Sequence, residues 1–474
     1  MTATPATATA FCWLTLFATM PAAAQHIDYA VRTTTAFSTE DKRDLGLAAG
    51  DSQDQFLVNF APRALIEFNP DWTGYARARV FLPTGRVAPF DSDQPDDPSP
   101  ARAFVGLNEI WVQYNGLTGY PGEALRIGRQ HIRQTGNEWW DQDADAIHWF
   151  FDTTLLRAEV GVARQFSTYR TDSPDVRTAQ RGQTYWFGNL ATDWSAHNQI
   201  GMRVTHAVAG QSPPQIGEAI EPGVQLQGTQ LTWVSVYADN GYYDIRGEEQ
   251  RVAYGSELTY LAGHERIALS GAGGTLAGQL AQDVAAWQAQ IGVRWQPLSQ
   301  VPLRFGAALV HSQGGESGGR SHQYRQTGMQ SNASYFTGTQ TLISRYGEAL
   351  RAQLGNLQVA TGTVSFGGED NEASFVFSRF RKDIGNAPIA TDNITAQPLN
   401  DDRDIGSSVD LIVTHYLARS GRRQHLLYRG DAFAARERRS LLSMRASLFQ
   451  PGAAYGPTAR TDYRVLLEVT LWLD

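Results

Sequence analysis

Apolar and polar residues alternate one by one along much of the chain. In residues 74–80, Arg77 and Arg79 point to one face, and small or apolar residues point to the other. The same period of two runs through residues 155–166, 287–295, 442–448 and 463–473. This pattern predicts β-strands that have one apolar face and one polar face.

The length and ends of these segments favour a membrane barrel over a soluble sandwich. The segments hold about 9 to 12 residues, which is enough for a tilted strand to cross a bilayer. Aromatic residues such as Phe166, Trp287, Trp295 and Tyr463 stand near segment ends, where interfacial girdles lie. We therefore predict an all-β protein, a transmembrane antiparallel β-barrel of about 18 strands, which would leave an aqueous channel.

The connections alternate in length, as expected for such a barrel. Short connections are expected near residues 69–73, 118–123 and 193–198. Long polar connections are expected near residues 83–104, 167–183, 210–228, 314–348 and 383–403. If the N-terminus is periplasmic, the long set lies outside the cell and the short set forms periplasmic turns.

The N-terminus resembles an export signal. Residues 11–24 are mostly apolar and end in three alanines, a run too short for a spanning helix. The preceding residues lack the usual Lys or Arg. We predict a signal peptide at 1–24 and a single barrel domain at 25–474. Cys12, the only cysteine, lies in the signal, so thiol catalysis and Cys-ligated metal are excluded from the mature chain.

Composition narrows the function. The net charge is -8 at pH 7, which argues against nucleic-acid binding. Lys42 and Lys382 are the only lysines among 40 basic residues. Arginine holds carboxylates with a planar fork and keeps its charge, so the excess hints at an anionic substrate. A coding bias would give the same excess.

Six strings, in order along the chain, resemble the outer-membrane alginate-export porin family. They are GLTGYPGEALRIGRQ at 116–130, FDTTLLR at 151–157, SRYGEALR at 344–351, LGNLQVAT at 354–361, DLIVTHY at 410–416 and FQPGAAYG at 449–456. The resemblance implies a monomeric eighteen-stranded barrel that passes an anionic polyuronate outward. It also implies an arginine-rich lumen, an outer lid loop and a periplasmic loop over the inner mouth.

The chain departs from the family pattern in two ways. Leu473 stands where the family has a terminal aromatic residue that the barrel-assembly machinery reads, and Asp474 adds a charge after it. Ser443 replaces one of two lumen arginines on the strand before the last, which leaves Arg445. The first departure concerns assembly rather than fold.

Arginines are the candidate substrate-path residues, because every sugar of a polyuronate carries a carboxylate and a charged lumen concentrates such a chain. Alternation points to Arg77, Arg79, Arg157, Arg294, Arg445 and Arg464. The resemblance adds Arg129, Arg133, Arg345 and Arg351. Of these ten, Arg129, Arg351 and Arg445 are the strongest choices. Glu159 and Glu468 share the lumen face, and we expect ion pairs that hold arginines in place.

Residues 417–440 form a basic segment just before the penultimate strand. Its seven arginines outnumber two acidic residues, a local balance of +5. They are Arg419, Arg422, Arg423, Arg429, Arg436, Arg438 and Arg439. By strand parity and by resemblance, we expect a periplasmic loop that collects the polymer and partly covers the mouth. A basic turn that meets anionic lipid or peptidoglycan is the alternative.

These features predict an outer-membrane porin that exports alginate or a related polyuronate by passive passage. The alternative is an anion-selective nutrient porin for uronates or other small organic acids. The ten histidines are scattered and form no catalytic string, so we expect no enzyme, no catalytic residue, no metal and no cofactor. Expected partners are the polysaccharide, outer-membrane lipid, the barrel-assembly machinery and periplasmic polysaccharide-secretion proteins.

Overall fold

The computed structural model describes most of the chain after the expected signal. The described residues are 26–41, 43–47, 52–84, 103–120, 122–134, 136–172, 176, 180–210, 216–217, 226–244, 250–270, 274–317, 319–419 and 439–473. The signal at 1–24, most of the connection at 83–104 and most of the basic segment lie outside these ranges. Within them, the chain contains no helix with the length and hydropathy needed to cross a bilayer.

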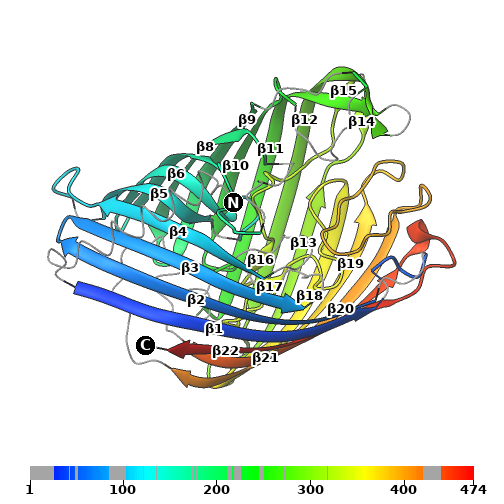
Figure 1. Ribbon diagram of the computed structural model, residues 1–474. Helices are drawn as coiled ribbons and strands as arrows, with labels where there is room; N and C mark the ends of the chain where they lie inside the picture. Colours follow the sequence, from blue (N-terminus) through cyan, green and yellow to red (C-terminus); the bar gives the residue numbers. More distant parts are fainter. Residues whose placement is uncertain are drawn as a thin grey trace.

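Eighteen antiparallel strands form one closed barrel, as predicted (Figure 1). The wall strands are β1 (His26–Asp41), β2 (Gln53–Asn69), β3 (Trp72–Thr84), β4 (Phe104–Tyr114), β5 (Glu123–Arg133), β6 (Asp141–Asp152), β7 (Leu156–Arg164), β8 (Gln183–Ser195), β9 (Asn198–Ala209), β10 (Gln230–Asp239), β11 (Val252–Ser270), β12 (Leu276–Trp295), β13 (Leu303–Ser312), β18 (Leu357–Gly367), β19 (Asn371–Lys382), β20 (Asp404–Arg419), β21 (Arg439–Pro451) and β22 (Asp462–Leu473).

The barrel closes where β1 meets β22, side by side in Figure 1. Val31 lies opposite Leu473, and Asp41 lies opposite Tyr463. The first and last described strands therefore begin and end at one mouth, which we call the terminal mouth. Closure pairs the backbone groups of both edge strands, as a structure immersed in lipid requires.

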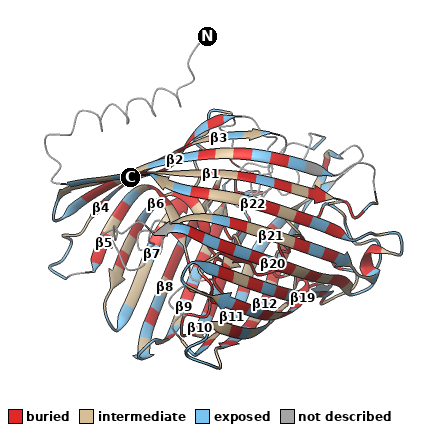
Figure 2. Ribbon diagram, turned by 90° about the horizontal axis from the view of Figure 1, so that it is seen from below, coloured by how far each residue is buried: buried red, intermediate tan, exposed pale blue. Residues whose placement is uncertain are grey.

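Side chains alternate across the wall as the sequence predicted (Figure 2). On β12, Trp287, Ile291 and Trp295 are exposed, and Gln288, Gln290 and Arg294 between them are buried. The exposed set faces the membrane, and the buried set faces a lumen that the protein itself largely fills. Tyr463 on β22 and Phe166, just past β7, are also exposed.

Connection lengths also follow the prediction, with one correction. The turns after β2 and β8 hold two residues each, whereas the connections after β3, β9 and β19 are long. All long ones named here leave the mouth opposite the terminal mouth, which is the extracellular side of such barrels. The connection between β13 and β18, expected to project outside near 314–348, instead folds into the lumen.

Short elements mark this inward course. They are β14 (Glu316–Ser317), β15 (Arg320–Ser321), β16 (Ala333–Ser334) and β17 (Ile343–Ser344). The β16–β17 pair forms a small sheet separate from the wall, and Figure 1 shows it within the barrel. A single turn of 3-10 helix, η3 (Ala453–Tyr455), lies between β21 and β22. We call residues 313–356 the plug connection.

The hairpin β5–β6 leaves the wall near its tip. Strand β5 pairs with β4 only from Leu125 to Arg129, although it pairs with β6 as far as Arg133. Beyond that point, residues 169–171 take over the pairing with β4. The hairpin tip then pairs with the plug connection, where the Asp141 amide donates to the Met329 carbonyl at 2.7 Å. The tip therefore partitions the lumen.

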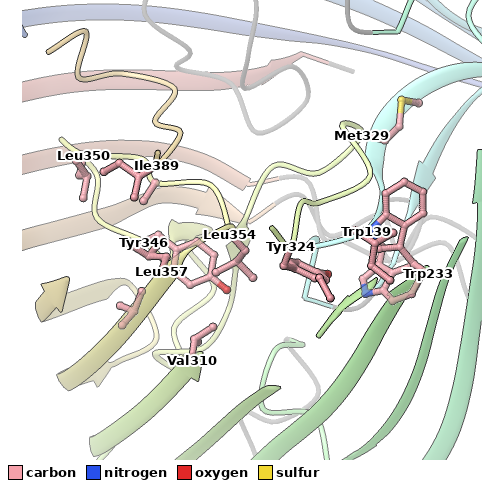
Figure 3. Close-up of a cluster of buried hydrophobic side chains, with 14 of the residues drawn as sticks. Trp139, Trp233, Val310, Tyr324, Met329, Tyr346, Leu350, Leu354, Leu357 and Ile389 are labelled. Carbon is pink, nitrogen blue, oxygen red and sulfur yellow. The ribbon is translucent and has the colours of Figure 1, made fainter. Parts of the chain in front are cut away.

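Apolar side chains from both inward segments form a core inside the barrel. Trp139 and Trp140 of the hairpin tip lie with Tyr324, Met329 and Trp233 (Figure 3). Leu350 and Leu354 of the plug connection and Leu357 of β18 extend this cluster, with Ile389 beside them. This buried apolar surface stabilises the inward course by roughly 2 kcal/mol for each fully buried large side chain.

Gly128 lies one residue before the pairing between β4 and β5 ends. Its φ of +130° lies in the region that favours glycine, and an added Cβ would stand 2.3 Å from the Ile110 carbonyl oxygen. We predict that Gly128→Ala lowers the free energy of unfolding by about 1–3 kcal/mol. Urea unfolding in lipid vesicles measures this change. Gly362→Ala is the matched control, because a Cβ there meets no atom within 4 Å. Equal stability of the two variants would contradict the assignment.

Candidate functional site in the lumen

Glu348 of the plug connection is the centre of an arginine cluster. Arg445 of β21 contacts its carboxylate at 2.7 Å, and Arg351 contacts the other oxygen at 3.6 Å. Arg464 of β22 donates to the Glu348 backbone carbonyl at 3.1 Å. Burial raises the pKa of Glu348, but Arg445 and Arg351 outweigh it and lower the pKa to about 2. The carboxylate is therefore ionised at neutral pH and fixes the plug connection to the last two strands.

Arg345 forms a second cluster with Glu138 from the hairpin tip. The two side chains make an ion pair, and Arg345 also donates to the Tyr243 hydroxyl at 3.1 Å. Tyr243 lies in the connection after β10, so this cluster joins three segments that are distant in sequence. Burial raises the pKa of Glu138, and Arg345 opposes that rise. Both charges are nearly inaccessible, which indicates a structural junction.

Arg294 of β12 binds backbone rather than acid. Its Nη1 donates to the carbonyl oxygens of Tyr242 at 3.1 Å, Tyr335 at 3.3 Å and Phe336 at 3.0 Å. The side chain is only 1% exposed. It therefore clamps the plug connection and the connection after β10 to the wall.

Charged side chains of the β5–β6 hairpin contact charged side chains of the neighbouring strands β3 and β4. Arg77 of β3 lies 3.4 Å from Asp143 of β6 and 3.0 Å from Glu109 of β4. His131 contacts Asp143 at 2.9 Å and Asp141 at 3.0 Å. These buried contacts hold the tip against β3 and β4.

The two family-derived arginines of β5 lie beside this contact. Arg129 approaches Asp145 at 3.7 Å and donates to the Ser167 carbonyl at 3.3 Å. Arg133 donates to the Asn137 side chain at 2.9 Å and lies 3.6 Å from Asp141. Both arginines therefore hold the hairpin tip in place, and they do not form a bare positive surface.

A chamber of about 520 Å³ opens between the hairpin tip and the terminal mouth. Arg157 of β7 lines it, 28% exposed, and contacts Asp193 at 3.2 Å and Asp152 at 3.5 Å. Other acidic lining residues are Glu159, Asp239 and Asp244. Arg126, Arg133 and Arg203 also line it, so the chamber has mixed charge and is not the purely arginine-lined surface expected from the sequence.

All ten predicted lumen arginines lie on or near inward-facing structure, but the structure does not bring them into one surface. Arg79 lies over the Phe104 ring at 4.7 Å. Six belong to nearly inaccessible contacts: Arg77, Arg79, Arg129, Arg294, Arg345 and Arg464. Arg351 and Arg445 keep side chains 16% and 19% exposed, in one cluster. Glu159 contacts His148 at 3.1 Å.

The basic segment is described only at its base. Arg419 and Arg439 lie opposite one another where β20 and β21 end at the terminal mouth. The two described ends of the segment therefore lie at the terminal mouth, between β20 and β21. Arg422, Arg423, Arg429, Arg436 and Arg438 lie outside the described residues.

Several functional residues escaped the sequence reasoning. Inward-facing arginines Arg63, Arg126, Arg203 and Arg304 obey the same alternation and could have been found by it. Glu138 and Glu348 gave no local signal, because their partners lie on distant strands. Across the described part of the chain, no group of three His, Cys, Asp or Glu residues is placed to hold a metal ion.

The fold is that of outer-membrane porins. Solved structures with this architecture include Pseudomonas aeruginosa OccK5 (OpdH), with a TM-score of 0.53, 10% identity, and coverage of 95% of this chain and 99% of that chain. Another is P. aeruginosa OpdK with vanillate, with a TM-score of 0.53, 9% identity, and coverage of 95% and 100%. At such low identity the likeness concerns the fold. The protein is located in the outer membrane.

The sequence then identifies the family. The profile named "Alginate export" matches residues 25–465, and the chain belongs to this family. Alginate production protein AlgE of P. aeruginosa is 33% identical over 455 residues, covering 91% of this chain and 89% of that protein. AlgE of Azotobacter vinelandii is 31% identical over 450 residues, covering 92% and 91%. The family is one of porins and not of enzymes, as the sequence predicted.

Glu348 generates a pH prediction. Its pKa of about 2 is below the ordinary 4.5, so the ionised form stabilises the folded barrel above pH 4.5. That contribution, about 3 kcal/mol, disappears as the pH falls from 4.5 toward 2. We expect Glu348→Gln to be less stable than the parent at pH 7, with a gap that narrows toward pH 2. Urea unfolding at stepped pH tests this, and Glu67→Gln at the terminal mouth is the control. A stability difference that does not change with pH would contradict the conclusion that the ionised Glu348 carboxylate stabilises the folded barrel.

Arg294 generates a conductance prediction. Lysine presents a point charge on a flexible stem and cannot hold three carbonyls in the arginine geometry. We expect Arg294→Lys to cost about 2 kcal/mol and to give larger, noisier single-channel currents as the plug connection loosens. Arg251→Lys is the control, since Arg251 donates to the Pro297 carbonyl at an exposed turn. Unchanged currents in Arg294→Lys would show that the clamp does not hold the plug connection.

Proposed function

We propose that this porin exports an anionic polyuronate, alginate or a close relative, by passive passage past the Glu348 cluster. The observation that carries the proposal is that Arg351 and Arg445 share the Glu348 carboxylate, and Arg464 holds the Glu348 backbone carbonyl, on the side of β20–β22. Family membership and the names of the AlgE relatives support the substrate class. The porin fold supports passive passage of the substrate, without an enzymatic step.

The two sides of the lumen differ in how their arginines are held, and this difference favours one route. The chamber along β6–β10 has mixed charge, because five acidic residues and four arginines line it, and each of these arginines already contacts a side chain of the protein. The opposite side carries Arg351, Arg445 and Arg464. It includes β20 and β21, the strands that the basic segment connects. We place the polymer path on this second side.

The Glu348 cluster suits transient binding. Conduction requires a grip that is strong enough for entry and weak enough for release. Glu348 already occupies part of each arginine fork, so a passing sugar carboxylate competes with it instead of meeting bare charge. An arginine presents five N–H donors, which leaves donors on Arg351 and Arg445 for the polymer.

Arg351 also carries backbone strain, consistent with a functional position. Its φ is +48°, the left-handed region that costs a non-glycine residue about 1–2 kcal/mol. Only its Glu348 ion pair is seen for the side chain among the described residues. The fold thus retains arginine where glycine would be easier to accommodate.

The basic segment and the partners complete the proposal. Its arginines would collect polymer at the terminal mouth, and periplasmic polysaccharide-secretion proteins would deliver it. The barrel-assembly machinery would insert the chain in spite of Leu473, which faces lipid in place of the family aromatic residue. We infer that the barrel works as a monomer.

Planar bilayer recordings test the route. Mannuronate oligomers added at the terminal mouth should block current in the parent. We expect block about tenfold weaker in Arg351→Gly and in Arg445→Gln, because each loses a charge-assisted contact. Glycine accepts the left-handed φ, so Arg351→Gly retains the fold and isolates the guanidinium.

Arg157→Gln is the matched control, because Arg157 is accessible but lies in the chamber along β6–β10, on the other side of the lumen. Weaker block in this variant alone would move the polymer path to the chamber. Block by monomeric uronates with no response to oligomers would favour the nutrient porin. Oligomer block unchanged in all three variants would refute the proposed route.

A further inference from the structure

Two arginines face the membrane instead of the lumen. Along β19, Phe375, Phe377, Arg379 and Arg381 form the outward row, and the residues between them are buried. Arg379 is 46% exposed and contacts Asp404 of β20 at 2.7 Å. Charge on the lipid-facing side of a barrel is costly in the bilayer interior and tolerated near the interfaces. Both arginines lie within the last four residues of β19, at its extracellular end.

An apolar groove leads away from these arginines across the outer surface. It measures about 850 Å³ and crosses β18, β13, β12, β11 and β10 toward the terminal mouth. Small side chains, Ala289 and Ala360, form its floor, and Ile291, Leu309 and Leu258 are exposed along it. The groove therefore continues along the lipid-facing wall from a basic end.

The basic end is built from neighbouring strands in register. Arg381 lies opposite Gln358 on β18, and Gln358 lies opposite His311 on β13. All three residues line the groove. Among the described residues, Arg381 makes no ion pair or hydrogen bond, so its guanidinium is available to a ligand.

We propose that this site binds one phosphorylated glycolipid of the outer leaflet, with an acyl chain in the groove and a phosphate on Arg379 and Arg381. Charge complementarity supports this occupant, because arginine forks match phosphate oxygens and basic pockets on membrane proteins hold anionic head groups. The position supports it too, since a head group at this mouth belongs to the outer leaflet. Asp404 opposes the phosphate by competing for Arg379.

Native mass spectrometry of the refolded full-length barrel tests the site. The probes are diphosphorylated lipid A, phosphatidylethanolamine and inorganic phosphate. We expect lipid A to remain bound, and its affinity to fall about fivefold in Arg381→Gln and about thirtyfold in Arg379→Gln with Arg381→Gln. Asp404→Asn should raise the affinity.

Arg164→Gln is the matched control, because Arg164 is also exposed at the extracellular end of a strand but lies outside the groove. Folding of each variant is checked by its heat-dependent gel mobility. Equal lipid A binding by the parent and the double variant would overturn the proposal. Equal loss in Arg164→Gln would show diffuse attraction, and binding of inorganic phosphate alone would show an anion site without a lipid role; either result also overturns it.

Discussion

The need to pair every backbone group in lipid governs this molecule. The wall must close on itself, and β1 and β22 do so over eleven consecutive residue pairs. A closed wall of eighteen strands would enclose a wide hole, and the strands themselves cannot narrow it. The chain narrows it with the plug connection and the hairpin tip. Everything specific about the pore therefore depends on how these two segments are held inside.

Buried charged side chains hold these two segments in place. Their exposure distinguishes the arginines that support the structure from those that select the substrate. Arg294, Arg345 and Arg77 contact acceptors on the inward segments and are almost inaccessible. Removing one partner from such buried pairs typically costs about 3–5 kcal/mol, which makes them structural joints. Arg351 and Arg445 join the same framework through Glu348 but remain partly open. An arginine-rich lumen thus divides into groups with different tasks.

The wall could be predicted from sequence, and the lumen could not. Alternation is a local signal, so the strand containing Trp287 and Trp295 and the inward position of Arg445 follow directly from it. The contact between Glu138 and Arg345 joins residues about two hundred positions apart, and no local pattern encodes it. The inward course of the plug connection was mistaken for an outer loop because its polar composition suits both. The departure of β5 from the wall near Gly128 could not be predicted, because a single glycine in a strand can have several structural roles.

The replacement of β5 by residues 169–171 along β4 has an evolutionary consequence. The gap that the departing hairpin leaves in the wall is sealed by a different piece of chain. Changes in the length or charge of the tip therefore leave the wall around the lumen closed. Such an arrangement is modular: the partition that shapes the passage can diversify, or be exchanged by design, while the shell around it stays the same.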